Sequence, residues 1–405
     1  MASQSALPDV GDLLPAIAEL AWPSAVAFAW LTGEAVHRVT GVPRISVYGL
    51  VGFALGATQL GFLPLAPGPN VILLANVAFG LILFEFGYRI NLRWLRTNPW
   101  IGVTGILESV ATFVVVYLVS ASFGAPSLTA LLLASLAMST SPAALMLVVN
   151  EERSSGQLTE RILHLTAVNC VLGLFVFKAI VGYWTFQSSG SLLHAVLGSL
   201  NALLVSAGLG AAFGLAVPAV LRRFGHVARD ATVAFAIGVV LLVAVTHALR
   251  LSPVLAALSF GLVARHRRVS LSPTQRNFGV LGDLLAVVLF MFVASTLEWQ
   301  RVWAGLGLAL AIIGARLLAK VIVVGGLARV SGITFRKGVL TGAALMPISV
   351  FVILLLEEAR YFGLELTDQL APLAAVALLL ELIGPVATQR ALMAAGESSE
   401  AVEKR

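Results

Sequence analysis

Long apolar runs dominate this chain, and short polar segments separate them. Thirteen runs are long enough to cross a bilayer, which takes about 20 helical residues. They cover 13–33, 45–63, 70–88, 99–121, 127–149, 160–185, 192–220, 229–249, 252–264, 277–297, 302–328, 338–356 and 368–389. The pattern predicts an all-α polytopic membrane protein with thirteen transmembrane helices. Pro142 and Pro347 each interrupt one run, and we expect a helix break at both because proline removes a backbone donor.

The composition agrees with a membrane protein and excludes several other classes. Of the 405 residues, 59% are apolar and only 11% are charged, whereas a soluble domain has about 25% charged residues. The single cysteine excludes an internal disulfide and a cysteine zinc cluster, and the six histidines show no metal-ligand spacing. The chain contains no hydrolase, metalloprotease or phosphate-loop motif. We therefore expect no enzyme activity, no metal, no cofactor and no nucleic-acid partner.

The basic residues predict how the chain lies in the membrane. With thirteen helices and the N-terminus outside, 20 of the 26 Lys and Arg residues fall in inner loops or at the C-terminal end. This distribution obeys the positive-inside rule. Only Arg250, Arg301 and Arg360 fall in outer loops. We expect a multi-pass protein of the cell membrane with its N-terminus outside and its C-terminus in the cytoplasm.

The two proline breaks lie in the fifth and twelfth segments, which cross the membrane in opposite directions because they are seven positions apart in the series, an odd number. Two broken helices of opposite sense indicate an inverted-topology repeat, in which secondary transporters place their substrate site near mid-membrane. A single proline is also tolerated as a kink in a membrane helix. Polar residues lie in the middle of the first broken segment and of the segment that comes after it: Ser139, Thr140, Ser141, Thr166, Asn169 and Cys170. Their cost in a bilayer favours a functional site.

Charged side chains inside the apolar runs are the other candidates for chemistry. Glu85 is either a snorkelling carboxylate paired with Arg89 or part of a site. Glu108 is either a functional carboxylate or the structural partner of Arg316. Arg316 keeps its charge, so we expect it to neutralise Glu108 or Glu85. Lys320, four residues further on, either belongs to the site or snorkels.

Motif-like segments occur in a fixed order along the chain. They are GEAVHRVTGVPRISVYGLVGFALG, LILFEFGYRINLRWLR, STSPAA, AVNCVLG, IIGARLLAK and ELIGP. This series resembles the monovalent cation:proton antiporters, which include the sodium/proton exchangers and potassium-efflux relatives. The likeness is to the family's basic entry loop, its Phe-Glu-x-Gly segment, its Thr-Asp-Pro break, its Asn-Asp or Asp-Asp pair, its helix with an embedded Arg or Lys, and its last helix.

The resemblance implies the sodium/proton antiporter fold over a single transmembrane domain, residues 1–405, in which the two broken helices cross. It implies a core of about 99–185 and 302–389 that moves against the remaining helices, which form the scaffold of a homodimer. The implied function is secondary active antiport of Na+ or K+ against protons by alternating access. The expected partners are the cation, the proton, the bilayer and a second copy of the chain.

Carried over onto this sequence, the family's ion site falls on Glu85, Thr140, Ser141, Thr166, Asn169 and Cys170, and its embedded cation falls on Arg316. Ser141 and Cys170 stand where the family has aspartates. Hard cations prefer oxygen ligands, whereas an ordinary thiol is protonated at neutral pH and soft. We therefore expect an atypical site whose titrating group is a glutamate. Two alternatives remain open: a carrier of an anion or another solute on the same fold, and a membrane sensor or scaffold without transport activity.

Overall fold

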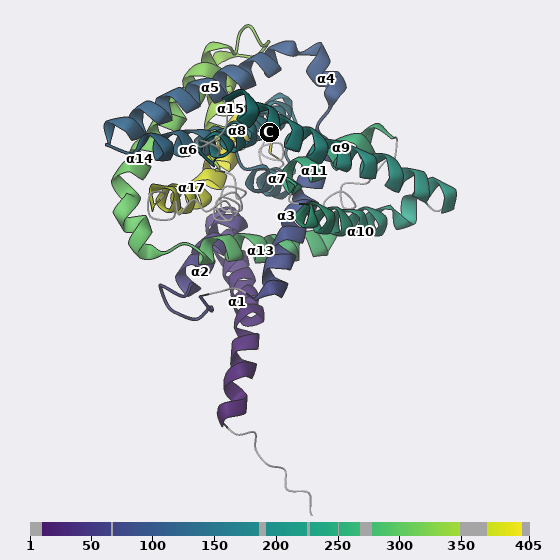
Figure 1. The fold of residues 1–405 in the computed structure, drawn as a ribbon, viewed down its shortest axis with the longest axis vertical. Helices are drawn as coiled ribbons and strands as arrows, with labels where there is room; N and C mark the ends of the chain where they lie inside the picture. The colour runs from purple at the N-terminus through teal and green to yellow at the C-terminus, as the bar shows by residue number, and fades with distance from the viewer. Residues whose placement is uncertain are drawn as a thin grey trace, which may run out of the picture.

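The computed structural model describes residues 10–65, 68–185, 192–224, 227–249, 251–267, 278–348 and 371–398. All of the named elements in the described chain are helices (Figure 1). Its helices are α1 (Val10–Thr40), α2 (Arg44–Leu55), α3 (Pro69–Arg89), α4 (Leu92–Thr97), α5 (Pro99–Ser122), α6 (Ser127–Met138), α7 (Pro142–Glu151), α8 (Gln157–Thr185), α9 (Leu192–Phe224), α10 (Val227–Ala248), α11 (Pro253–His266), α13 (Gly279–Ser295), α14 (Trp299–Gly326), α15 (Phe335–Ala344) and α17 (Ala371–Ala395).

The described helices confirm an all-α multi-pass membrane protein. By length and composition, 7 of them could each cross a bilayer alone: α3, α5, α8, α9, α10, α14 and α17. Shorter apolar helices, α2, α6, α7, α11 and α13, accompany them. The count of thirteen crossings and the orientation of the termini stay predictions.

Helix ends differ from the predicted segments where polar residues continue a helix beyond its apolar run. α1 continues to Thr40 and α17 to Ala395. The hydrophobic pattern did not predict the short helix α4, since its sequence LRWLRT is too short and too basic to span. Its start is nevertheless encoded locally, because the Asn91 side chain accepts hydrogen bonds from the backbone N–H groups of Arg93 and Trp94.

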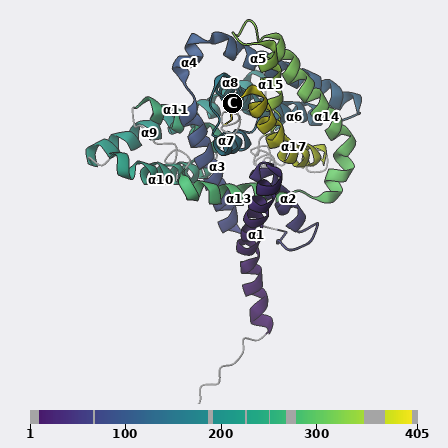
Figure 2. The ribbon, with the colours of Figure 1, turned by 180° about the vertical axis from the view of Figure 1, so that it is seen from behind.

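The helices pack in two neighbourhoods. α14 packs against α5, α15 and α17, and α8 packs against α5 and α6, whereas α11 packs against α9 and α3. Figure 1 shows α14 and α17 on one side of the molecule and α9 and α10 on the other, with α1 projecting from the body, and Figure 2 shows the same arrangement from behind. The expected division into a core and dimerisation helices stays a prediction.

Glycines allow a close contact between α3 and α11. A Cβ atom on Gly87 would lie 2.1 Å from the Leu258 carbonyl oxygen, and one on Gly261 would lie 2.0 Å from the Phe84 carbonyl oxygen. Such distances leave no room for a side chain. The two backbones therefore touch directly, as small residues permit in membrane helix pairs. This contact fixes the position of α3, which carries Glu85.

Candidate functional site

Two interrupted helices provide the framework of the site. α6 ends at Met138 and α7 begins at Pro142, with extended backbone between them. α15 ends at Ala344, and the chain continues without helical structure to Ile348. Both interruptions fall where the prolines predicted them. Ser349 and the second half of the predicted segment 338–356 lie outside the described residues.

The two interruptions cross and bond to each other. Thr140 and Ile348 form an isolated antiparallel bridge, and the Ser141 backbone N–H donates to the Pro347 carbonyl at 3.0 Å. These contacts satisfy backbone groups that neither helix can pair within itself. The predicted crossing of two broken segments is therefore confirmed for the part that the structure describes.

Arg316, on α14, fills this crossing and is fully buried. Its Nε donates to the Ala137 carbonyl at 2.8 Å. Its terminal nitrogens donate to the carbonyls of Ser139 at 3.0 Å, Pro347 at 3.2 Å and Met346. Carbonyls at helix C-terminal ends carry partial negative charge. One guanidinium thus neutralises the ends of both α6 and α15.

The expectation that Arg316 pairs with Glu108 or Glu85 is wrong for the described residues, in which Arg316 forms no salt bridge. Lys320 instead donates to Glu108 Oε1, and both side chains have 0% exposure. Lys320 therefore does not snorkel. Its Nζ also lies 3.4 Å from the Met138 carbonyl and 3.5 Å from Thr140 Oγ1. This buried ion pair joins α5 to α14 beside the first break.

The polar residues of α8 bind the first break rather than an open space. The Cys170 thiol donates to the Thr140 carbonyl at 3.0 Å. Asn169 Nδ2 donates to Thr140 Oγ1 at 3.4 Å, and Asn169 Oδ1 accepts from Ser109 Oγ at 2.9 Å. All of these side chains are buried. Because the thiol acts as a donor to a neutral carbonyl, it keeps its proton here and presents no charge to a cation.

Ser141 and Thr166 have different roles at the crossing. The Ser141 hydroxyl accepts the Ala144 backbone N–H at 3.1 Å, so it caps the start of α7. Thr166 Oγ1 and Glu108 Oε2 are buried and have no hydrogen-bond partner among the described residues. Buried polar atoms are almost always paired. These two oxygens are therefore able to accept a hydrogen bond from a water molecule or to ligate a cation, and Glu108 Oε2 is also able to bind a proton.

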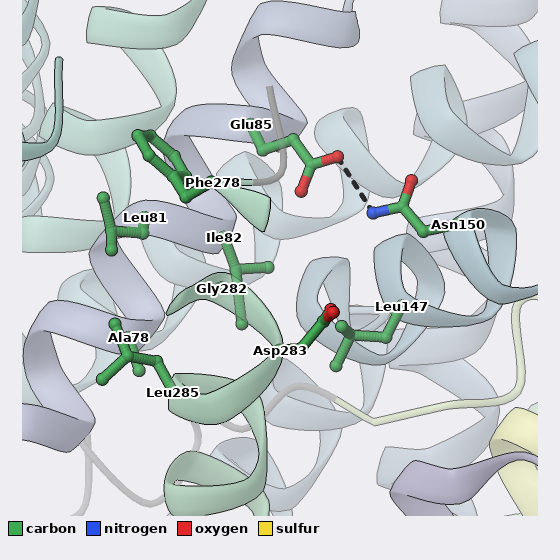
Figure 3. Close-up of a pocket in the computed structure, with 10 residues that line it drawn as sticks. All are labelled: Ala78, Leu81, Ile82, Glu85, Leu147, Asn150, Phe278, Gly282, Asp283 and Leu285. Carbon is green, nitrogen blue, oxygen red and sulfur yellow. Dashed lines mark hydrogen bonds between the residues drawn. The ribbon is translucent and has the colours of Figure 1, made fainter. Parts of the chain in front are cut away.

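Glu85 lies apart from the crossing, beside a small cavity between α3, α7 and α13 (Figure 3). Its Oε1 accepts from Arg89 at 3.2 Å and from Asn150 Nδ2 at 3.0 Å. Asp283 lines the same cavity, whose volume is about 20 Å³. That volume holds about one water molecule. The expected pair between Glu85 and Arg89 is confirmed.

The predicted site residues therefore do not all converge. Thr140, Asn169 and Cys170 meet at the crossing, whereas Asn150 and Glu85 lie near the other end of α7. Asn150 is about 12 Å along that helix from its start at Pro142, at about 1.5 Å per residue.

Sequence reasoning missed two residues of the cavity, Asn150 and Asp283. The signal for Asp283 was present, because it is an acid inside the apolar run 277–297. Asn150 gave a weaker signal, since it stands where the apolar run 127–149 has just ended.

Comparisons with known proteins agree with this geometry. Among solved structures, the chain is similar to that of the sodium proton antiporter MjNhaP1 from Methanocaldococcus jannaschii at pH 8, with a TM-score of 0.64 and 17% sequence identity. That alignment covers 95% of this chain and 99% of the other. Comparison with curated protein sequences gives no significant match. The model of the family described as "Sodium/hydrogen exchanger, transmembrane" matches residues 24–394. The chain therefore belongs to the transmembrane sodium/hydrogen exchanger family.

Proposed function

We propose that this protein is a proton-coupled antiporter of Na+ or K+ that works by alternating access, and that a glutamate rather than Cys170 carries its titration. Family membership and the crossing of two broken helices support antiport. The proposal includes a homodimer with outer N-termini and cytoplasmic C-termini.

The observation that carries the proposal is the position of Glu85 beside the cavity (Figure 3). Its carboxylate and that of Asp283 supply the oxygen ligands that hard cations require. Arg89 donates to both Glu85 and Asn150, so it holds these two side chains in fixed positions. A carboxylate binds either a proton or a cation at one place. That competition is what an exchanger needs to couple the two.

The groups at the crossing are less suited to exchange an ion or to bind an anion. The Cys170 thiol donates to Thr140 and offers one soft ligand. The Arg316 guanidinium already binds backbone carbonyls, and the Lys320 ammonium already binds Glu108. Neither cation is available to an anionic solute in this arrangement. The geometry therefore favours cation exchange at Glu85 over an anion carrier.

The proposal is tested in proteoliposomes by imposing Na+, K+ or Li+ gradients and following internal pH with a fluorescent dye. Glu85→Gln should abolish cation-dependent proton flux, because the amide can neither bind a proton exchangeably nor balance a cation. Cys170→Ser is the matched control and should leave most of the flux, since a hydroxyl also donates to the Thr140 carbonyl.

Two results would count against the proposal. Loss of flux in Cys170→Ser with retained flux in Glu85→Gln would overturn the assignment of the titrating group. An unmodified protein that moves protons with none of the three cations would overturn antiport itself.

A further inference from the structure

Glu381, on α17, is a third embedded glutamate, and it differs from the other two. Glu85 has Arg89 beside it and Glu108 has Lys320. The Glu381 residue is only 8% exposed, and its Oε1 has no hydrogen-bond partner among the described residues. A carboxylate embedded in a membrane protein is a functional group by default, because burying it without a role is costly.

The Glu381 side chain lies in the contact between α17 and α2. A Cβ atom added to Gly49 would lie 3.2 Å from both Cδ and Oε1 of Glu381. Ser46, one turn earlier on α2, donates to the Leu382 carbonyl at 2.9 Å. The carboxyl group is therefore packed closely against the α2 backbone, where a Cβ atom at position 49 would require it to shift by a few tenths of an ångström.

α17 also touches the second helix break. A Cβ atom on Gly384 would lie 2.7 Å from Pro347 Cα, and Thr388 Oγ1 donates to the Ala344 carbonyl at 2.8 Å. Glu381 is one turn from Gly384 on the same helix. A change in the packing of α17 against α2 is thus transmitted directly to the crossing.

The charges on the helices packed against α17 are engaged elsewhere. The charged or titratable residues of these helices include Arg44 and Tyr48 of α2, Glu151 of α7, Glu160, Arg161, His164 and Lys178 of α8, Arg301, Arg316 and Lys320 of α14, and Arg336 and Lys337 of α15. Arg301 binds Glu298, and Arg336 donates to the Ala394 carbonyl. Arg44 binds Glu151, Arg161 binds Ser331, and Lys337 binds Glu397. The two α14 cations bind the breaks and Glu108, as described above. In the described part of the chain, no cation pairs with the Glu381 carboxyl group.

We propose that Glu381 is a second proton-binding site, which holds its proton while α17 packs against α2 and releases it when this contact opens to water. The inference rests on the proposed antiport, and it adds a regulatory proton to the exchange at Glu85. An ionised carboxylate without a partner is strongly disfavoured in apolar surroundings, so the closed contact requires the neutral form. The same group is free to ionise once it is hydrated.

The sign of the pH dependence follows from proton linkage. The closed α2–α17 contact binds one more proton than the open contact, so low pH favours the closed form and high pH favours the open form. Between the two titration limits, the ratio of open to closed changes by up to about tenfold per pH unit. Glu381→Gln is permanently neutral and should remove this dependence, whereas Glu381→Asp should retain it.

The direct test uses dicyclohexylcarbodiimide, which adds to protonated carboxyl groups in apolar surroundings. The full-length protein in lipid vesicles is treated across a pH series, and its peptides are analysed by mass spectrometry. Label should appear at Glu381, decrease as the pH rises, and be lost in Glu381→Gln. Glu108 is the internal control, because its ion pair with Lys320 should keep it unlabelled. Absence of label at Glu381 even at low pH would overturn the inference.

Transport supplies an independent readout of the same proposal. The pH profile of cation-driven proton flux should flatten in Glu381→Gln by up to about tenfold per pH unit and persist in Glu381→Asp. Glu298→Gln, at a half-exposed position paired with Arg301, is the surface control and should keep the original profile. An unchanged profile in Glu381→Gln refutes the regulatory proton while antiport stands. Labelling of Glu381 in a protein without any antiport supports the proton site and refutes the proposed function instead.

Discussion

The buried pair of Lys320 and Glu108 permits a quantitative prediction. Lys320→Met removes the ammonium and, among the residues that the structure describes, leaves Glu108 with a single other hydrogen bond, from Thr112 Oγ1 at 3.3 Å. Both charged side chains are completely inaccessible to solvent, so screening by water does not reduce the effect. Breaking a buried pair by removing one partner costs about 3–5 kcal/mol. We expect this loss of unfolding free energy in Lys320→Met and a similar loss in Glu108→Leu.

The double variant provides the decisive comparison. Replacing both partners of a buried ion pair by apolar side chains of similar volume is often neutral. We therefore expect the protein that carries both Glu108→Leu and Lys320→Met to be more stable than either single variant. Equilibrium unfolding in mixed micelles, followed by circular dichroism, gives the three free-energy changes and their coupling energy.

Two outcomes would contradict this reasoning. Losses below about 1 kcal/mol in both single variants are typical of an exposed pair, and they would mean that water reaches the two charges. Additive losses in the double variant would mean that the two side chains do not depend on each other.

Two further predictions concern the close contact between α3 and α11 and the ion pairs of Glu34, near the end of α1, with Arg38 and Arg44. Gly87→Ala should destabilise the protein by about 1–3 kcal/mol in the same unfolding assay, because the new methyl group would meet the Leu258 carbonyl at 2.1 Å. Gly102→Ala is the control, since a Cβ atom there would have no neighbour within 4 Å. Equal effects at both positions would disprove the close contact. Hydrogen bonds from Arg44 and then Arg38 lower the pKa of Glu34 from its ordinary 4.5 to about 2. A lowered pKa stabilises the fold above the ordinary value, so the difference in melting temperature between the unmodified protein and Glu34→Gln should shrink as the pH falls from 4.5 to about 2. A difference that does not change over this range would show that Glu34 gains nothing from its two arginines.

Local features of the sequence were sufficient to predict the membrane class, the helical fold and both helix breaks. An apolar run must form a helix in a bilayer, because no water is present to satisfy its backbone groups. Proline weakens a helix through its own ring and its missing N–H, but Pro218 and Pro385 lie inside α9 and α17, so the opposite sense of the two interrupted segments was needed as well. Pro142 and Pro347 therefore marked the breaks before any contact was known.

The partners of the charged residues depended on the tertiary structure. Arg316 and Lys320 lie one turn apart on the same face of α14, separated by about 6 Å along the helix axis. From the sequence, either could have faced Glu108. The position of α14 along its own axis, relative to the two breaks, places Arg316 against the backbone carbonyls and Lys320 against the Glu108 carboxylate.

The grouping of the site residues was likewise a tertiary result. Glu85 shares a cavity with Asn150 and Asp283 because α3, α7 and α13 converge there, and no spacing in the sequence encodes that convergence. In the sequence, Glu381 stood out only as the first residue of the ELIGP segment. Within the described part of the chain, its isolation from cations follows from the way α17 packs against α2, because long-range packing decides which charges come within reach of one another.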